Sequence, residues 1–219
     1  MTQTTLNPLM NMATLPARMR HLPIGPNGYI VPWFVGWLPN GEPEFRAMDP
    51  QKWVRAVKER LCWVCGQKLG AHLVFVLGPM CAITRTTSEP ACHRDCARWS
   101  AQNCPFITRP HMHRRENDLP ETIQPPAGYH IARNPGVMAL WITSSFKIFD
   151  DGEGRPLISV GPADEVEWYA EGRVATRAEV LESVRTGVPA LEEVARQQDG
   201  GMEELDRQCQ AAEAWYPAE

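Results

Sequence analysis

Apolar residues in the first two thirds of the chain follow two different periods, and each period predicts its own kind of element. Residues 29–38 and 137–149 are rich in aromatic and β-branched side chains and lead into turns that contain Gly, as strands of hairpins do. Asp49 and Pro50 precede apolar residues at helical spacing, which predicts a helix over residues 50–61. The expected strand pairs are 29–38 with 44–46 and 137–149 with 156–160, and the expected inward side of the helix is Trp53, Val54, Val57 and Leu61.

Helical spacing dominates from residue 162 onwards, together with the residue types that begin and end helices. We expect a short helix over 162–170 that is closed by Gly172. The run from Thr176 to Glu179 has the form of a capping box and opens a second helix, which Gly187 is expected to stop. Two further helices are expected, one from Pro189 to the stop at residues 199–201 and one over 202–216.

These patterns divide the chain into three parts. Residues 1–27 are polar, rich in Met and interrupted by prolines, so we expect a flexible N-terminal arm. Residues 28–160 are expected to form an α+β domain with short antiparallel hairpins, and residues 161–219 a helical C-terminal region. The predicted fold class is therefore α+β.

Composition and charge limit the classes of function that the chain can have. The chain has 219 residues, 43% of them hydrophobic, and a formal net charge of −4, so it can bury a core and is not a polycation. Nonspecific binding of nucleic acid through overall charge is therefore disfavoured, while a local basic patch can still serve. No apolar run has the length of a signal peptide or a membrane span, which predicts a cytoplasmic protein with no membrane partner.

Two pairs of metal-ligating residues stand out among the seven cysteines, which a reducing compartment makes available for metal binding. Cys62 and Cys65 are followed by Gly66, which permits the positive φ that a zinc knuckle requires. His93 and Cys96 are three residues apart, so both lie on one face of a helix that is expected to begin near residues 88–90. The full spacing is Cys-x2-Cys-x27-His-x2-Cys.

A hairpin over residues 72–84 is expected between the two pairs, and the order of knuckle, hairpin and helix is that of a treble clef. Four protein ligands leave the ion no open position for water or substrate. The sequence therefore predicts one Zn²⁺ with a structural role.

Other cysteines offer alternative ligands. Cys92 stands beside His93 and would give the spacing Cys-x2-Cys-x26-Cys-x3-Cys, and Cys81 and Cys104 are also near in sequence. His93 is favoured because its three-residue spacing to the next cysteine suits one helical turn. Cys209 is expected to pack in the core. The competing interpretation is that the cysteines are reduced, buried core residues.

Four motifs carry a family resemblance, namely CWVCGQKLG (62–70), FVLGPMC (75–81), SEPACHRDCA (88–97) and NCPF (103–106), and the similarity continues through 109–116 and 134–137. Together they resemble a group of uncharacterised zinc-binding proteins of bacteriophages and actinomycetes, and the resemblance implies a zinc module without an assigned activity. At fold level the site is also similar to the zinc core of His-Asn-His nucleases, but the expected hairpin offers only His72 and no adjacent acid for their catalytic pair.

A cationic run beyond the cysteines is a candidate phosphate-binding segment, with Trp63 and Trp99 as neighbouring aromatics, although a solvated loop has the same composition. The leading hypothesis is a non-enzymatic, zinc-stabilised binding protein, of phage origin by resemblance, that contacts nucleic acid or a protein partner. The alternative is a metal-dependent nuclease or hydrolase related to the His-Asn-His enzymes. The cationic residues of the run are Arg109, His111, His113, Arg114 and Arg115.

Overall fold

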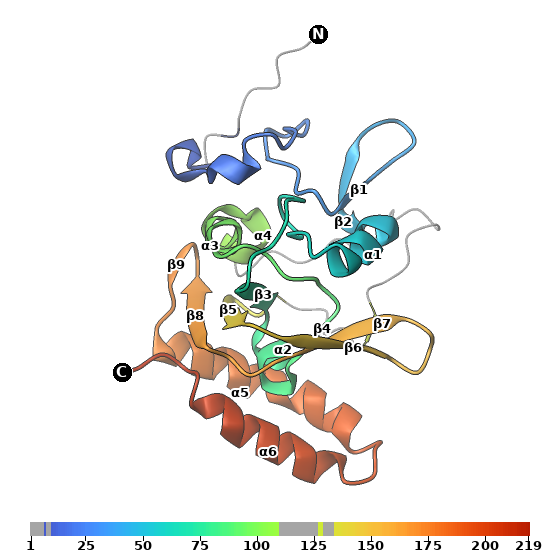
Figure 1. Ribbon diagram of the computed structural model, residues 1–219. Coiled ribbons are helices and arrows are strands. Elements are labelled where there is room, and N and C mark those ends of the chain that lie inside the picture. Colours follow the sequence, from blue (N-terminus) through green and yellow to red (C-terminus); the bar gives the residue numbers. More distant parts are fainter. Residues whose placement is uncertain (1–6, 8–9, 110–126, 129–133) are drawn as a thin grey trace.

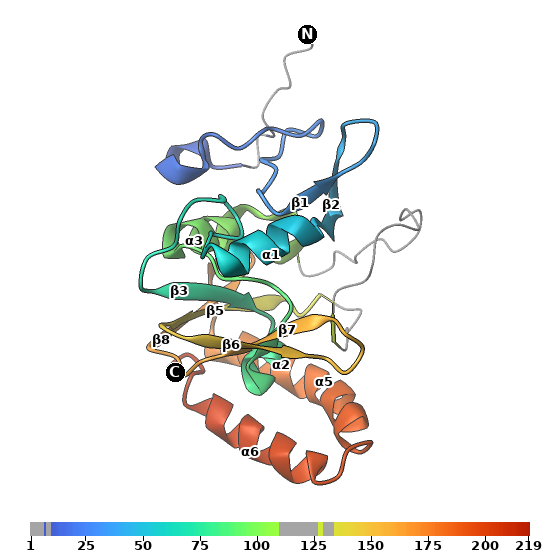
Figure 2. The same ribbon diagram turned by 45° about the vertical axis from the view of Figure 1, so that its right-hand side comes forward.

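Two antiparallel sheets occupy the middle of the molecule, and two long helices lie on one side of them (Figures 1 and 2). On the other side lie residues 61–69 and 92–96, which carry the predicted metal ligands and are called the metal-site segments. The computed structural model describes residues 7, 10–109, 127–128 and 134–219. It has the mixed α+β class that the sequence predicts. In chain order the elements are the 3-10 turns η1 (Met12–Thr14) and η2 (Ala17–Met19), β1 (Val35–Trp37), β2 (Pro43–Met48), α1 (Pro50–Lys58), β3 (Leu73–Leu77), α2 (Pro79–Thr84), β4 (Thr86–Thr87), α3 (Arg94–Asn103), α4 (Pro105–Thr108), β5 (Val137–Thr143), β6 (Phe146–Asp150), β7 (Pro156–Val160), β8 (Glu165–Ala170), β9 (Arg173–Val174), α5 (Arg177–Ala195) and α6 (Gly201–Glu213).

Strand β5 is central in the larger sheet, whose order is β3-β5-β8-β9. Trp141 of β5 lies opposite Phe75 of β3 and opposite Val166 of β8. Helix α3 covers the sheet on the side of the metal-site segments, and α2 and α5 cover it on the other side (Figures 1 and 2). Because both faces are covered, β5 is apolar and buried along nearly its whole length instead of alternating.

The segment predicted as one strand over 137–149 is two strands in different sheets. β5 ends at Thr143, and β6 begins at Phe146 and joins the second sheet, whose order is β4-β7-β6. The predicted hairpin with 156–160 is therefore correct for β6, in which Phe146 lies opposite Val160. The first half of the predicted strand instead pairs with β3 and β8.

Strand β8 takes the place of the helix predicted over 162–170, and that prediction is wrong. All of β8 pairs with β5, from Glu165 opposite Ile142 to Ala170 opposite Val137. A short segment with only a few apolar residues is compatible with either kind of element. Here the pairing with β5, which is distant in sequence, makes residues 165–170 a strand.

Helix α5 runs continuously from Arg177 to Ala195, although Gly187 was expected to end it and Pro189 to begin another helix. Its capping box at Thr176 and Glu179 is formed as predicted. A proline inside a helix costs about 3 kcal/mol. Buried residues on both sides of Pro189 pack against α2 and α6 and outweigh that cost.

The described part of the N-terminal arm is packed and not loose. Asn11 N donates to Asn103 Oδ1 at 2.9 Å, and Trp99 Nε1 donates to the Asn11 carbonyl at 3.2 Å, which fastens the arm to α3. Prolines suggested a flexible segment, but apolar residues between them reach the core. The buried side chains of this segment are Met10, Leu15, Met19 and Leu22.

Strand β1 is shorter than the predicted strand over 29–38. Pro32 has no N–H to donate, and Trp33 N donates to the Val64 carbonyl at 2.7 Å, which brings this segment onto the knuckle. Helix α1 begins as predicted, with Asp49 as its N-cap. Its inward side differs at one position, because Val54 is 43% exposed and Ala56 is buried instead.

Two groups of buried residues form the core of the described chain. The main group extends from Met10 to Val180 and contains residues of all three parts into which the sequence was divided. The second group lies between α2, α5 and α6, and Cys209 packs against it. Its buried members are Met80, Ile83, Ala195, Leu205 and Ala212.

Candidate metal centre

The knuckle that carries the first two cysteines is a tight loop between α1 and β3. Leu61 and Lys68 pair across its base, Cys62 N donates to the Gln67 carbonyl at 2.7 Å, and Gly66 N donates to the Cys62 carbonyl at 2.8 Å. Gly66 has a φ of +73°, the conformation that a side chain disfavours. The loop therefore turns both thiols toward the same point.

The second pair of residues lies at the start of α3. His93 is the N-cap residue and Cys96 belongs to the first turn, because α3 begins at Arg94 and not near residues 88–90. Val74 of β3 exchanges two backbone hydrogen bonds with Cys92, of 3.1 and 2.7 Å. This bridge fixes the residues directly before α3 against β3, so that the start of α3 lies beside the knuckle.

The hairpin predicted over 72–84 is not formed. β3 pairs with β5, and α2 occupies the place where the return strand was expected. Pro79 follows Gly78 in a pair that resembles a turn, but Pro79 is the first residue of α2, a position that proline favours.

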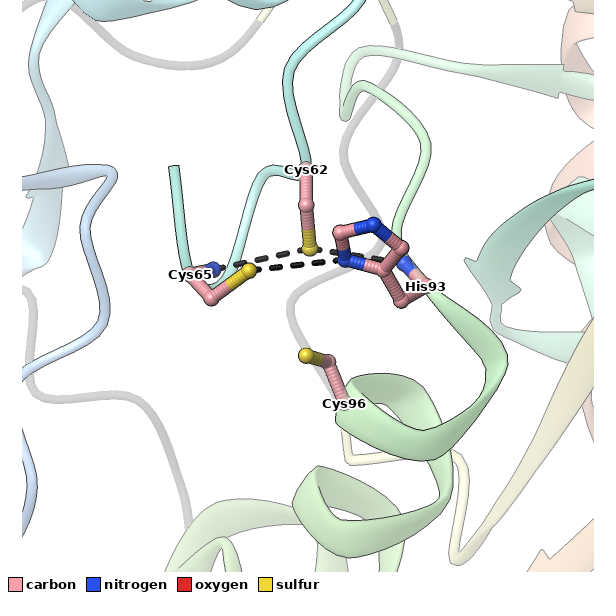
Figure 3. Close-up of side chains that lie close together, drawn as sticks. All are labelled: Cys62, Cys65, His93 and Cys96. Carbon is pink, nitrogen blue, oxygen red and sulfur yellow. Dashed lines mark hydrogen bonds between the residues drawn. The ribbon is translucent and has the colours of Figure 1, made fainter. Parts of the chain in front are cut away.

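The side chains of Cys62, Cys65, His93 and Cys96 converge on one small volume (Figure 3). Their ligand atoms all lie within 4.8 Å of one another, and the three cysteines are buried. Cys65 Sγ is 3.4 Å from His93 Nδ1. Tetrahedral zinc with ordinary Zn–S and Zn–N bond lengths would separate sulfur and nitrogen ligands by about 3.6 Å. The group is therefore positioned to hold a metal ion.

Backbone and carbonyl groups orient these ligands. Cys62 Sγ accepts hydrogen bonds from Cys65 N at 3.5 Å and from His93 N at 3.3 Å, as a metal-bound thiolate does. His93 Nε2 lies 2.9 Å from the Lys68 carbonyl. A carbonyl only accepts, so in the neutral imidazole that binds a metal ion Nε2 carries the proton and Nδ1 presents its lone pair to the three thiols.

Charge in the cluster favours a divalent cation. Burial raises the pKa of Cys62, but hydrogen bonds from Cys65, Cys92, Cys96 and His93 outweigh it and hold that pKa far below its ordinary value. Hydrogen bonding to the Cys62 thiolate raises the pKa of Cys96 well above its ordinary range and that of His93 to about 10. Without a metal ion, ionisation of a second thiol beside the Cys62 thiolate is disfavoured, because the two negative charges repel each other. A divalent cation removes that repulsion and allows all the thiols to ionise.

The remaining cysteines lie outside this group. Cys92 is buried against Cys62, and its hydrogen bond to that thiolate raises its pKa well above the ordinary value. Burial also raises the pKa of Cys81, to about 11, and that of Cys104. Neither of these two belongs to the cluster, and Cys209 is in the second core.

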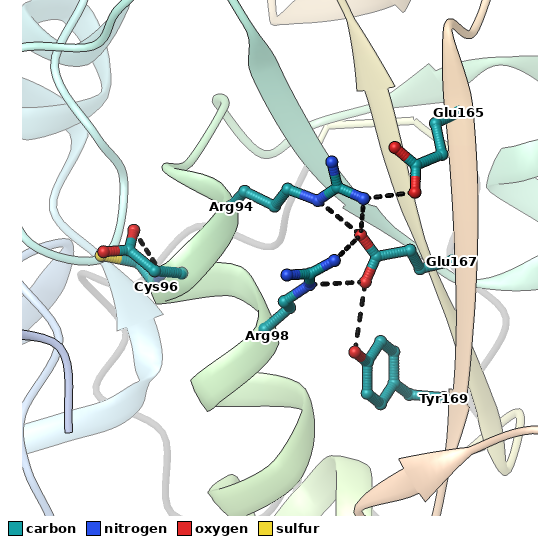
Figure 4. A network of polar contacts seen from close by, with 7 residues as sticks. Arg94, Cys96, Arg98, Glu165, Glu167 and Tyr169 are labelled. Carbon is teal, nitrogen blue, oxygen red and sulfur yellow. Dashed lines mark hydrogen bonds and ion pairs between the residues drawn. The ribbon is translucent and has the colours of Figure 1, made fainter. Parts of the chain in front are cut away.

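An ion-pair network fastens α3 to β8 (Figure 4). Arg94 Nε donates to Glu167 Oε1 at 2.6 Å and also pairs with Glu165. Arg98 donates to both oxygens of Glu167, at 2.7 and 2.8 Å, and Tyr169 donates to one of them at 3.1 Å. Burial raises the pKa of Glu167, but the hydrogen bonds from Arg98 and Arg94 outweigh it, so that pKa is lowered.

This network is not among the sequence predictions. Its signal is a pair of arginines four residues apart on α3 and a pair of glutamates two residues apart on β8. The second spacing puts both carboxylates on one face of a strand. It becomes informative once residues 165–170 are known to be a strand.

Most of the predicted cationic segment lies outside the described residues, namely His111, His113, Arg114 and Arg115. Arg109 is described and exposed, and its carbonyl accepts a hydrogen bond from Asn134 Nδ2 at 3.1 Å. Trp63 and Trp99, the aromatics expected beside it, are buried at 1% and 6% exposure. They therefore offer no stacking surface.

Comparison with known proteins gave no relative from which to infer a function. The chain matches no protein-family model, and the searches of curated proteins and of solved structures found no match either. Within the described residues, no helix has the length and apolar character that crossing a membrane requires.

Proposed function

We propose that this chain is a zinc-stabilised binding protein without enzymatic activity, in which Cys62, Cys65, His93 and Cys96 hold one structural Zn²⁺. The observation that carries the proposal is the convergence of three thiols and one imidazole within 4.8 Å. Soft sulfur ligands with one imidazole in a tetrahedral arrangement are typical of zinc. Zinc with four protein ligands has no coordination position for substrate, so it contributes to folding and not to a reaction.

The arrangement around the ion supports a treble-clef-like module. The knuckle comes first, β3 follows and is bridged to Cys92, and the first turn of α3 supplies the second ligand pair. The bridge replaces the complete hairpin of a treble clef, and α2 and β4 are inserted between its two sides. The proposal also includes a phage or actinomycete origin, which the resemblance of the motifs implies. It further places the protein in the cytoplasm, where reducing conditions would keep the thiols available for the metal ion.

A binding role is suggested by the surface that the metal would stabilise, which the knuckle, the N-terminal segment and α3 form together. Gln67 of the knuckle donates to the Arg18 carbonyl at 3.4 Å, and the Arg18 guanidinium pairs with Asp95 of α3 at 2.9 Å. The zinc module thereby holds the N-terminal segment in place and presents a fixed surface at this end of the molecule. The partner classes consistent with such a surface are nucleic acid and protein.

Zinc content and stability together test the proposal. We expect about one zinc per chain in protein purified without added metal, and its loss together with a large fall in Tm in Cys65→Ser and Cys96→Ser. Cys209→Ser is the matched control, because Cys209 lies in the second core and should leave zinc content unchanged. A folded wild type without zinc would refute the metal assignment. Mg²⁺-dependent cleavage of DNA by zinc-loaded protein would favour the nuclease alternative.

A further inference from the structure

Charge is distributed very unevenly over the molecule. Residues 1–109 contain 12 Lys and Arg against 6 Asp and Glu, whereas residues 134–219 contain 7 against 17. Helices α5 and α6, which carry many of these acids, lie at the far end from α1 and the N-terminal segments (Figures 1 and 2). The small overall charge therefore conceals an acidic end at α5 and α6 (Figure 1) and an excess of cations among residues 1–109.

Four of the cations of residues 1–109 lie on or beside the knuckle. Arg60 and Lys68 flank it, because Leu69 N donates to the Arg60 carbonyl at 2.8 Å and Leu61 pairs with Lys68. Lys58 lies in the last turn of α1, and Arg20 follows the segment that Gln67 contacts. We call Arg20, Lys58, Arg60 and Lys68 the knuckle cations. All four are exposed.

Few negative charges oppose these side chains. Glu59 faces the same region, but it pairs with Arg55 at 3.0 Å, and Asp95 pairs with Arg18 at 2.9 Å. None of the knuckle cations has a carboxylate within ion-pair distance among the described residues, and Arg60 donates only to the Gly70 carbonyl, at 3.3 Å. Three thiolates with Zn²⁺ would add a single negative charge. The surface therefore remains strongly positive.

An aromatic ring accompanies the cations. Trp33 is half-buried and lies directly against Gly66 of the knuckle, and the Arg55 guanidinium stands 5.7 Å from its ring centroid. Interleaved cations and aromatic rings are typical of surfaces that bind the backbone and bases of nucleic acids.

We propose that the knuckle cations, with Trp33, form a surface that binds the phosphodiester backbone of nucleic acid. This inference rests on the proposed function, because zinc holds the knuckle in shape. Nucleic acid is favoured over an acidic protein because unpaired point charges around a rigid loop fit regularly spaced phosphates. The acidic end would keep the rest of the molecule away from the polyanion.

Salt-dependent binding to a labelled DNA duplex tests the surface. Contact of the four cations with phosphates should weaken wild-type binding by about 150-fold between about 50 and 200 mM salt. Lys58→Gln/Lys68→Gln removes two contacts and should reduce that factor to about 12-fold. The matched control is Arg185→Gln/Arg207→Gln at the acidic end, which should behave as the wild type.

Zinc content and Tm, measured on the same samples, separate the two proposals. Zinc-loaded wild type without salt-sensitive binding would overturn the nucleic-acid surface and leave the structural zinc standing. An unchanged salt dependence in Lys58→Gln/Lys68→Gln and in Arg20→Gln would refute this surface, and equal competition by polyglutamate would identify an acidic protein as the partner. Absence of zinc in the wild type would overturn the proposed function first.

Discussion

Replacement of Gly66 by Ala should lower the free energy of unfolding by about 2–5 kcal/mol. Gly66 has a φ of +73°, where a residue with a Cβ is disfavoured by about 1–2 kcal/mol. An added Cβ would also lie 2.7 Å from two ring atoms of Trp33, and overpacking of this kind costs about 1–3 kcal/mol. Trp33 cannot move freely, because its ring also packs edge-to-face against Trp63, with the two ring centroids 6.4 Å apart.

Two other glycines separate these contributions. Gly41 has a φ of +81° with nothing within 4 Å of an added Cβ, so Gly41→Ala should cost only the conformational part, about 1–2 kcal/mol. Gly70 has neither a positive φ nor a neighbour within 4 Å. Gly70→Ala should therefore be neutral or stabilise the protein by up to about 1 kcal/mol.

Urea unfolding of the zinc-loaded variants measures all three changes, provided that the m-value stays constant. If Gly66→Ala is no more destabilised than Gly41→Ala, the close approach of Trp33 to the knuckle is wrong. If it behaves as Gly70→Ala does, the left-handed turn at Gly66 is wrong as well. Zinc content should be determined for each variant, so that loss of metal is not mistaken for strain.

Three further changes test the surroundings of the site. Asp49→Ala removes the N-cap of α1 and should cost about 1 kcal/mol in urea unfolding, while Asp49→Asn should restore most of it. Thr176→Ala breaks the capping box of α5 and should cost a similar amount, about 1 kcal/mol; no change in Tm would contradict the observed cap. Glu167→Gln weakens the ion pairs with Arg94 and Arg98 and should cost about 1–2 kcal/mol at neutral pH. The folded-state pKa of Glu167 is lowered, so its stabilisation is complete above the ordinary value of about 4.3 and fades as pH falls through the folded-state value. The Tm difference from wild type should therefore shrink as the pH falls below about 4.3, and a pH-independent difference would refute the charge-based explanation.

Local signals explain which parts of the structure follow from the sequence. Cys62 and Cys65 are held together by one short turn, and His93 and Cys96 by one helical turn, so their spacing sufficed to predict that they face common points. The N-cap at Asp49 and the capping box at Thr176 are equally local. Each of these features depends on residues within a few positions of one another.

The errors concern elements that distant partners decide. Residues 165–170 become a strand because β5 pairs with them, and β3 leaves its expected hairpin because β5 is also its partner. Pro189 remains inside α5 because α2 and α6 pack on both sides of it. The contact of Arg94 with Glu167 likewise requires the tertiary fold.

The bridge between Val74 and Cys92 also bears on the order in which the chain folds. Pairing of β3 with β5 joins Leu73 to Thr143, and the entropy of closing so long a loop must be lost before the sheet gains any contact. A metal ion held by the four ligands would close a shorter loop, from Cys65 to His93, and the bridge would then fix one edge of β3. Metal binding would thus order β3 before β5 pairs with it, and would help the two strands to pair in the correct register. The metal ion would then act on the speed of folding as well as on the stability of the folded state.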